Sequence, residues 1–144
     1  MAGQALSKRE SPTASRKLRI LVVDDERDLV ITLATLLRDE GHVVDGAYSA
    51  TDALTTVKQF NPDVVLLDIA LPDGSGYAVA EHIRRRYGDK RPMLIALTGV
   101  YARPPHDKLH RIVGCDHFLT KPFEIDEVLR LIAPLTLESG PTPR

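Results

Sequence analysis

Cysteine is nearly absent from this chain, because Cys115 is its only cysteine among 144 residues. A single cysteine excludes an internal disulfide and fits a reduced, cytosolic setting. No stretch approaches the roughly 18 consecutive apolar residues that a membrane span requires. Residues 1–17 also lack the apolar core of a secretory signal. We therefore expect a cytoplasmic protein with no membrane partner.

An excess of charge of one sign is lacking as well. The chain has 19 Lys and Arg residues against 20 Asp and Glu residues, which gives a formal net charge of −1. This balance gives no electrostatic reason to expect nucleic acid as a partner. With 43% hydrophobic residues in 144, the chain is predicted to form one domain with a substantial core. We expect disordered tails at residues 1–17 and 136–144 around a folded domain at residues 18–135.

Five short apolar runs alternate with helix-like segments. The runs occupy residues 18–23, 42–47, 63–67, 93–97 and 116–120. After the first run, leucines recur at helical spacing until Gly41, and later helices are predicted to open at Ser49, around Val79, near Pro105 and after Phe123. Short β-branched runs separated by helices predict an α/β fold with a parallel sheet.

Five polar residues stand at or just past the ends of these runs: Asp24, Asp25, Asp68, Thr98 and Lys121. The carboxyl ends of parallel strands share one edge of a sheet, so these side chains are expected to converge. Each aspartate alone is more often a turn or helix-cap residue. Together they crowd three negative charges, and two like charges at 4 Å cost up to about 4 kcal/mol at an effective dielectric of 20. A hard divalent cation such as Mg²⁺ (or Mn²⁺), with Lys121, would relieve that repulsion.

The same set suits phosphoryl transfer. Asp68 is able to attack phosphorus and form an acyl phosphate, while Lys121, Thr98 and the metal offset charge on the phosphoryl oxygens. No Gly-x-x-x-x-Gly-Lys loop is present, so a nucleotide is not the obvious phosphoryl donor.

Five motifs carry this chemistry: LVVDDE at 21–26, PDVVLLD at 62–68, LPDGSGY at 71–77, ALTG at 96–99 and FLTKPF at 118–123. In order and spacing they resemble the receiver domains of two-component response regulators, and they span essentially the whole folded region. The resemblance implies a flavodoxin-like, doubly wound (βα)5 fold whose five-stranded parallel sheet has the order 2-1-3-4-5.

The resemblance also implies roles for individual residues. Asp68 would be phosphorylated from a histidine kinase or a histidine phosphotransfer protein, and Lys121 would bind the phosphoryl group. Thr98 and Phe118 would form the switch pair, and a cis peptide bond is expected before Pro122. The expected metal ligands are Asp24, Asp25, Asp68 and the backbone carbonyl of Ala70.

Three features depart from the family pattern. Residues 103–105, Arg-Pro-Pro, are unusually stiff, and the switch aromatic is Phe118 rather than the frequent Tyr. Leu131 stands where dimerising receivers usually place an Arg. We expect a monomer or weak dimer that binds a downstream protein through the fourth helix, the fifth strand and the last helix.

Three alternatives to a stand-alone receiver that catalyses only its own phosphorylation and dephosphorylation stay open. The first is a Mg²⁺-dependent phosphohydrolase of the aspartyl-phosphate type, although the second Asp of such enzymes would fall at Ala70. The second is a receiver-like module that binds partners without phosphorylation, and the third is a piece of a hybrid kinase.

The remaining polar clusters have ordinary interpretations. His106 and His110 are four residues apart, but a solvated helix is favoured over a metal pair. Cys115 is predicted to be a small buried residue. Residues 84–86, Arg-Arg-Arg, are predicted to be a solvated helix end favoured by the helix dipole.

Overall fold

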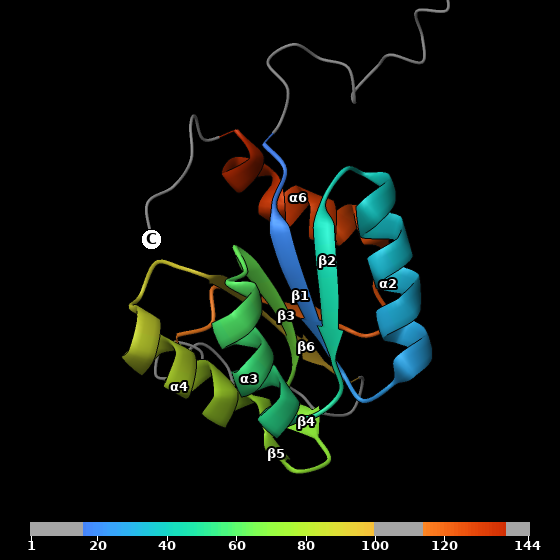
Figure 1. Cartoon of the computed structure of the whole chain (residues 1–144). Helices are drawn as coiled ribbons and strands as arrows, with labels where there is room; N and C mark the ends of the chain where they lie inside the picture. The colour runs from blue at the N-terminus through green and yellow to red at the C-terminus, as the bar shows by residue number, and fades with distance from the viewer. Residues whose placement is uncertain (1–15, 100–113, 138–144) are drawn as a thin grey trace, which may run out of the picture.

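The computed structural model describes residues 16–99 and 114–137. Its main sheet has five strands in the order β2-β1-β3-β6-β7, and all neighbouring pairs are parallel (Figure 1). Counted along the chain, this is the order 2-1-3-4-5, so the predicted fold is confirmed. The strands are β1 (Arg19–Val23), β2 (Val43–Ala47), β3 (Val64–Asp68), β6 (Met93–Thr98) and β7 (His117–Thr120).

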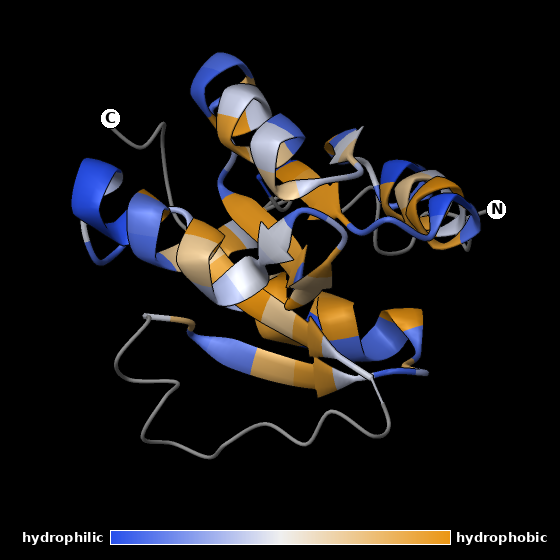
Figure 2. Cartoon of the chain, turned by 90° about the horizontal axis from the view of Figure 1, so that it is seen from below, coloured by the Kyte–Doolittle hydropathy of each residue, from blue (hydrophilic) through white to orange (hydrophobic). Residues whose placement is uncertain are grey.

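Helices cover both faces of the sheet because the central strands are apolar on both sides. In β1, Ile20 and Val22 pack in one cluster with α2 (Arg27–Asp39) and α6 (Ile125–Thr136). The alternate residues Leu21 and Val23 pack in a second cluster with α3 (Ala50–Phe60) and α4 (Gly76–Tyr87). Figure 2 shows that these helices turn hydrophobic sides to the sheet and hydrophilic sides outward. The core therefore has two layers, one on each face of the sheet.

The strand register aligns the carboxyl ends of the strands. Val23 of β1 pairs with Ala47 of β2 and Leu67 of β3. At the other side of the sheet, Thr98 of β6 pairs with Thr120 of β7. The residues that follow these strand ends consequently emerge along a single edge.

The turn-rich segment after Asp68 folds into a small hairpin. Its antiparallel strands are β4 (Ala70–Leu71) and β5 (Gly74–Ser75). The sequence did not predict this hairpin, because two-residue strands are too short to show an alternating pattern.

The prediction that residues 84–86 form a solvated helix end is wrong for Arg84. Its side chain is only 9% exposed, and its guanidinium donates to the carbonyls of Gly114 (2.9 Å), Pro92 (2.9 Å) and Gly88 (3.3 Å). It also forms an ion pair with Asp116 at 2.8 Å. The helix α4 is thereby tied to the segments that lead into β6 and β7, and only Arg85 and Arg86 of the triplet are exposed as predicted.

The expected tail boundaries fall inside hydrogen-bonded structure. The Arg16 N–H donates to the Thr136 carbonyl at 2.7 Å, and the Arg16 guanidinium pairs with Asp63 at 3.2 Å. No helix within the described residues is long and apolar enough to cross a membrane. The predicted helix near Pro105, the Arg-Pro-Pro segment and the histidine pair lie outside the described residues.

Candidate functional site

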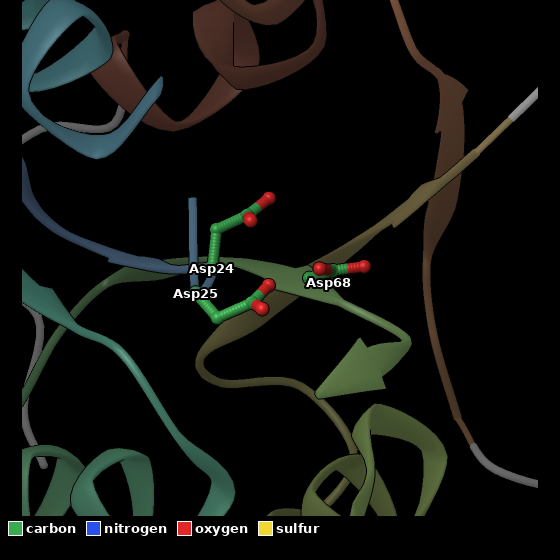
Figure 3. Close-up of side chains that lie close together, drawn as sticks. All are labelled: Asp24, Asp25 and Asp68. Atoms are coloured by element: carbon green, nitrogen blue, oxygen red, sulfur yellow. The ribbon is translucent and has the colours of Figure 1, made fainter. Parts of the chain in front are cut away.

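Three carboxylates converge at the carboxyl edge of the sheet, as predicted. Asp24 and Asp25 follow β1, and Asp68 is the last residue of β3. Figure 3 shows their side chains directed toward the same space, and one carboxylate oxygen from each lies within 4.8 Å of the others. Asp24 is 0% exposed and Asp68 is 5% exposed, whereas Asp25 is open to solvent. The three negative charges therefore meet where two of them are largely removed from water.

Lys121 lies against this cluster as the expected cation. Its Nζ is 2.7 Å from Asp24 Oδ2 and 3.5 Å from Asp68 Oδ2. The Lys121 N–H donates to the carbonyl of Thr98 at 2.7 Å, which places the lysine beside the end of β6. The peptide bond between Lys121 and Pro122 is cis, as expected. One ammonium therefore bridges the ends of β1 and β3.

The remaining oxygens of the two buried aspartates accept backbone hydrogen bonds. Asp24 Oδ1 accepts from the N–H of Glu26 at 2.9 Å, and Asp68 Oδ1 accepts from the N–H of Ala70 at 3.1 Å. Each bond spans two residues and closes a turn directly after a strand. Both carboxylates are thus fixed in orientation before any ligand arrives.

Charge and burial perturb the titration of this site. Burial raises the pKa of the Asp68 carboxyl, and the negative charges of Asp24 and Asp25 raise it further, against the opposing effects of the Ala70 hydrogen bond and Lys121. For Lys121, burial lowers the pKa, but the hydrogen bond and charge of Asp24 outweigh burial, so the pKa is raised overall. The site favours a protonated lysine and resists a third uncompensated negative charge.

The donor set fits a hard divalent cation. Three carboxylates face a single nearby lysine, and all their candidate ligand atoms are oxygens. Oxygen ligands with excess negative charge suit Mg²⁺, which is bound through one or two carboxylates together with phosphoryl oxygens. Ala70, the fourth expected ligand residue, is exposed at the start of the hairpin.

Thr98 and Phe118 occupy neighbouring strands. Thr98 is fully buried, and its hydroxyl donates a long hydrogen bond of 3.5 Å to the Leu119 carbonyl. Phe118 is half-buried and packs against Tyr77, with ring centroids 6.4 Å apart and planes tilted by 55°. The Thr98 hydroxyl is therefore engaged with β7 rather than with the carboxylates.

Comparison with known proteins decides the family. The family model of the response regulator receiver domain matches residues 20–133. This chain belongs to that family. Receiver domains are signalling domains of two-component systems that work with histidine kinases or phosphotransfer proteins, and they bind Mg²⁺ at an acidic cluster.

Two curated relatives are transcriptional regulatory proteins. DltR of Streptococcus agalactiae is 38% identical over 124 residues, which cover 85% of this chain and 54% of the relative. TcrA of Mycobacterium tuberculosis is 34% identical over 128 residues, which cover 88% of this chain and 49% of the relative. The receiver described here thus spans about half the length of these relatives.

Solved structures of receivers have the same fold. A CheY-like receiver domain protein from Methanospirillum hungatei superposes with a TM-score of 0.75 at 28% identity, covering 85% of this chain and 94% of that one. The response regulator TrrA from Thermotoga maritima, solved in complex with Mg²⁺–BeF, gives a TM-score of 0.71 at 35% identity, covering 81% of this chain and 97% of that one.

The receiver site includes two residues that the sequence did not single out as functional. The Glu26 carboxylate lies 3.7 Å from Lys121 Nζ and adds a fourth, exposed negative charge. Only its position directly after Asp24 and Asp25 in the sequence could have indicated that Glu26 lies at the site. Tyr77 follows the turn after Asp68, and its hydroxyl is buried without a hydrogen-bond partner among the described residues. Nothing in the sequence indicated that Tyr77 would contact the switch aromatic.

Cys115 and Leu131 lie away from the carboxylates. Cys115 is buried, as predicted, and burial raises the pKa of its thiol to about 12. Leu131, which stands where dimerising receivers usually place an Arg, is half-buried and packs against the core cluster shared by α2 and α6.

Proposed function

We propose that this receiver accepts a phosphoryl group on Asp68 from a phosphohistidine of a sensor kinase or of a phosphotransfer protein. One observation carries the proposal: Lys121 lies between Asp24 and Asp68, inside a cluster of three carboxylates at the edge of the sheet. Such a cluster is costly in an empty site and useful where a metal and a phosphoryl group bind.

The chemistry is a transfer between two nucleophiles. A carboxylate oxygen of Asp68 forms a bond to phosphorus while the bond from phosphorus to the donor imidazole nitrogen breaks, and that nitrogen keeps the electron pair. The Ala70 N–H holds Asp68 Oδ1, which limits rotation of the nucleophile. Lys121, 3.5 Å from Asp68 Oδ2, is placed to pair with the phosphoryl oxygens.

The expected metal ligands are Asp24, Asp25, Asp68 and the Ala70 carbonyl. When bound there, Mg²⁺ (or Mn²⁺) would supply charge neutralisation for the phosphoryl oxygens. The chain would then act as a signalling domain that catalyses only its own phosphorylation and dephosphorylation.

The switch pair would pass the signal outward. The Thr98 hydroxyl gives up its long bond to the Leu119 carbonyl and donates to the phosphoryl group, which leaves room for a change of the Phe118 side chain. We propose that a downstream protein binds the surface made by β7, α6 and the helix predicted near Pro105. We expect this monomer or weak dimer to act in the cytoplasm.

The test is phosphorylation with a small donor. Incubation of the protein with Mg²⁺ and acetyl phosphate should raise the intact mass by one phosphoryl group, and fragmentation should place that group on Asp68. Asp68→Asn should not be modified, whereas Asp39→Asn, at an exposed position on α2, should behave as wild type.

Two outcomes would contradict the proposal. Equal modification of Asp68→Asn and wild type would exclude Asp68 as the acceptor. Many turnovers of a phosphate ester in steady state would instead favour the phosphohydrolase alternative.

A further inference from the structure

The hairpin after Asp68 is attached to the site at its base. The Gly76 N–H donates to the Ile69 carbonyl at 3.0 Å, and a Cβ at Gly76 would overlap the Asp68 carbonyl. At the other strand of the hairpin, the Ala70 N–H donates to the Asp68 carboxylate at 3.1 Å. The backbone that carries the Ala70 carbonyl therefore starts and ends beside the phosphoacceptor.

The tip of the hairpin is attached to a different element. Asp73 Oδ1 accepts from the N–H of Ala50 at 2.7 Å, and Asp73 Oδ2 accepts from the N–H and the hydroxyl of Thr51 at 3.1 and 2.9 Å. These groups form the first turn of α3, whose backbone N–H groups have no partner inside the helix. The bond from Ala50, followed by those from Thr51, lowers the pKa of Asp73.

The helix has a second cap that does not involve the hairpin. Ser49 Oγ accepts from the N–H of Asp52 at 3.1 Å. Ser49 is therefore a local cap for α3, whereas Asp73 reaches the same turn from more than 20 residues away. Loss of either cap weakens the helix start, but only loss of Asp73 releases the hairpin.

The hairpin depends on these attachments because it is very small. Each strand has two residues, with Ala70 paired to Ser75 and Leu71 paired to Gly74. An isolated two-stranded hairpin is marginally stable at best in water. Its conformation is consequently set by its base at Asp68 and its tip at Asp73.

We propose that Asp73 is a positioning residue for the metal site of this receiver. By fixing the hairpin tip to the first turn of α3, Asp73 holds the Ala70 carbonyl beside Asp68 in the place of a metal ligand. This inference rests on the proposed function, because it assigns the Ala70 carbonyl to the metal.

The experiment compares Mg²⁺ binding by wild type, Asp73→Ala and Ser49→Ala, measured by calorimetry with the metal alone. Loss of a residue that holds a metal ligand typically lowers metal affinity about 10- to 100-fold. Asp73 holds a backbone ligand only indirectly, so the lower end of that range, about tenfold, applies. Asp73→Ala should therefore bind Mg²⁺ about tenfold more weakly. Ser49→Ala should bind Mg²⁺ as wild type does, although both variants lose a cap of α3.

Two further readouts separate positioning from general damage. Amide hydrogen exchange at Ala70 and Gly74 should accelerate in Asp73→Ala and stay unchanged in Ser49→Ala. Phosphorylation by acetyl phosphate should slow in Asp73→Ala at low Mg²⁺ and recover at saturating Mg²⁺. Asp73→Asn keeps one acceptor oxygen for Ala50 and should give intermediate Mg²⁺ affinity, which keeps the test valid if the alanine variant does not fold.

Unchanged Mg²⁺ affinity in both Asp73 variants would overturn the inference. Equal weakening in Asp73→Ala and Ser49→Ala would overturn it too, since Asp73 would then act only through the stability of α3. Failure of wild type to bind Mg²⁺ would refute the metal site of the proposed function, and the positioning role would fall with it.

Discussion

Replacement of Arg84 by Ala should be among the most destabilising single changes to a charged residue of α4. The Arg84 guanidinium donates to three carbonyls and pairs with Asp116, while its side chain is only 9% exposed. Asp116 also accepts from the N–H of Leu94, the second residue of β6, at 2.8 Å. Truncation of Arg84 therefore removes the group that joins α4 to the segments entering β6 and β7.

The magnitude follows from burial and from the number of bonds. A hydrogen bond that involves a charged group contributes about 1.5–3 kcal/mol, and the Arg84 guanidinium makes two part-buried ones to carbonyls at 2.9 Å. Because the Asp116 side chain is 38% exposed and keeps its bond from Leu94, loss of the ion pair itself adds little, and a total loss of about 3 kcal/mol is expected. A loss of about 3 kcal/mol corresponds to a fall in Tm of about 12 °C, at about 4 °C per kcal/mol for a domain of this size.

The assay is urea unfolding of wild type, Arg84→Ala, Arg84→Lys and Arg85→Ala. Arg84→Lys keeps the charge but loses the planar fork, so it should recover only a minor part of the loss. Arg85 is exposed on the same helix, and its truncation should change the free energy of unfolding by less than about 0.5 kcal/mol. A loss in Arg84→Ala no larger than that in Arg85→Ala would refute the role assigned to this side chain.

Three other predictions concern buried polar groups. In chelator, Asp68→Asn should have a higher Tm than wild type because it removes one of three repelling charges. The control Asp63→Asn should have a lower Tm than wild type. A lower Tm for Asp68→Asn would show that the carboxylates do not repel. His42 Nδ1 accepts from the Leu18 N–H at 3.1 Å, and burial lowers the His42 pKa below its ordinary value of 6.5, so the unfolded chain is protonated first. The contribution of His42 to the free energy of unfolding should thus be full above pH 6.5 and fall as the pH drops through the lowered pKa. The free energy of unfolding of His42→Asn should depend less on pH, and equal pH profiles of the two proteins would refute the effect. The Cys115 thiol, with a pKa of about 12, should react with a disulfide reagent only as fast as the protein unfolds, so rapid labelling of folded protein would contradict its burial.

The sequence predicted the part of this receiver that depends on short-range patterns. Apolar runs predicted all five strands of the sheet to within one residue at each end. The rule that parallel strands share a carboxyl edge then predicted that Asp24, Asp68 and Lys121 lie together. The position of the site could be predicted because a polar residue that directly follows a buried strand must lie at the edge of the sheet.

Contacts that depend on long-range placement were beyond the sequence. Arg84 appeared to be one of three equivalent arginines, and only the path of the chain at Gly114 shows that it is buried. Likewise, the bonds from the first turn of α3 to Asp73 join segments more than 20 residues apart. Neither side chain differs by type or spacing from exposed neighbours, so local patterns hold no signal for them.

Buried aspartates at the two edges of the sheet differ in how far their negative charge is compensated. At the amino edge, Asp63 is 3% exposed, and its two oxygens accept from the Arg16 guanidinium and the Arg19 N–H. At the carboxyl edge, Asp24 and Asp68 share one lysine with two more acidic residues nearby. Compensated charge stabilises a fold, whereas uncompensated charge at a fixed position is a binding determinant for a cation. Repulsion between the carboxylates at this edge destabilises the unliganded domain. Binding of a metal and a phosphoryl group relieves the repulsion, and this gain in free energy can couple binding to the conformation of the domain.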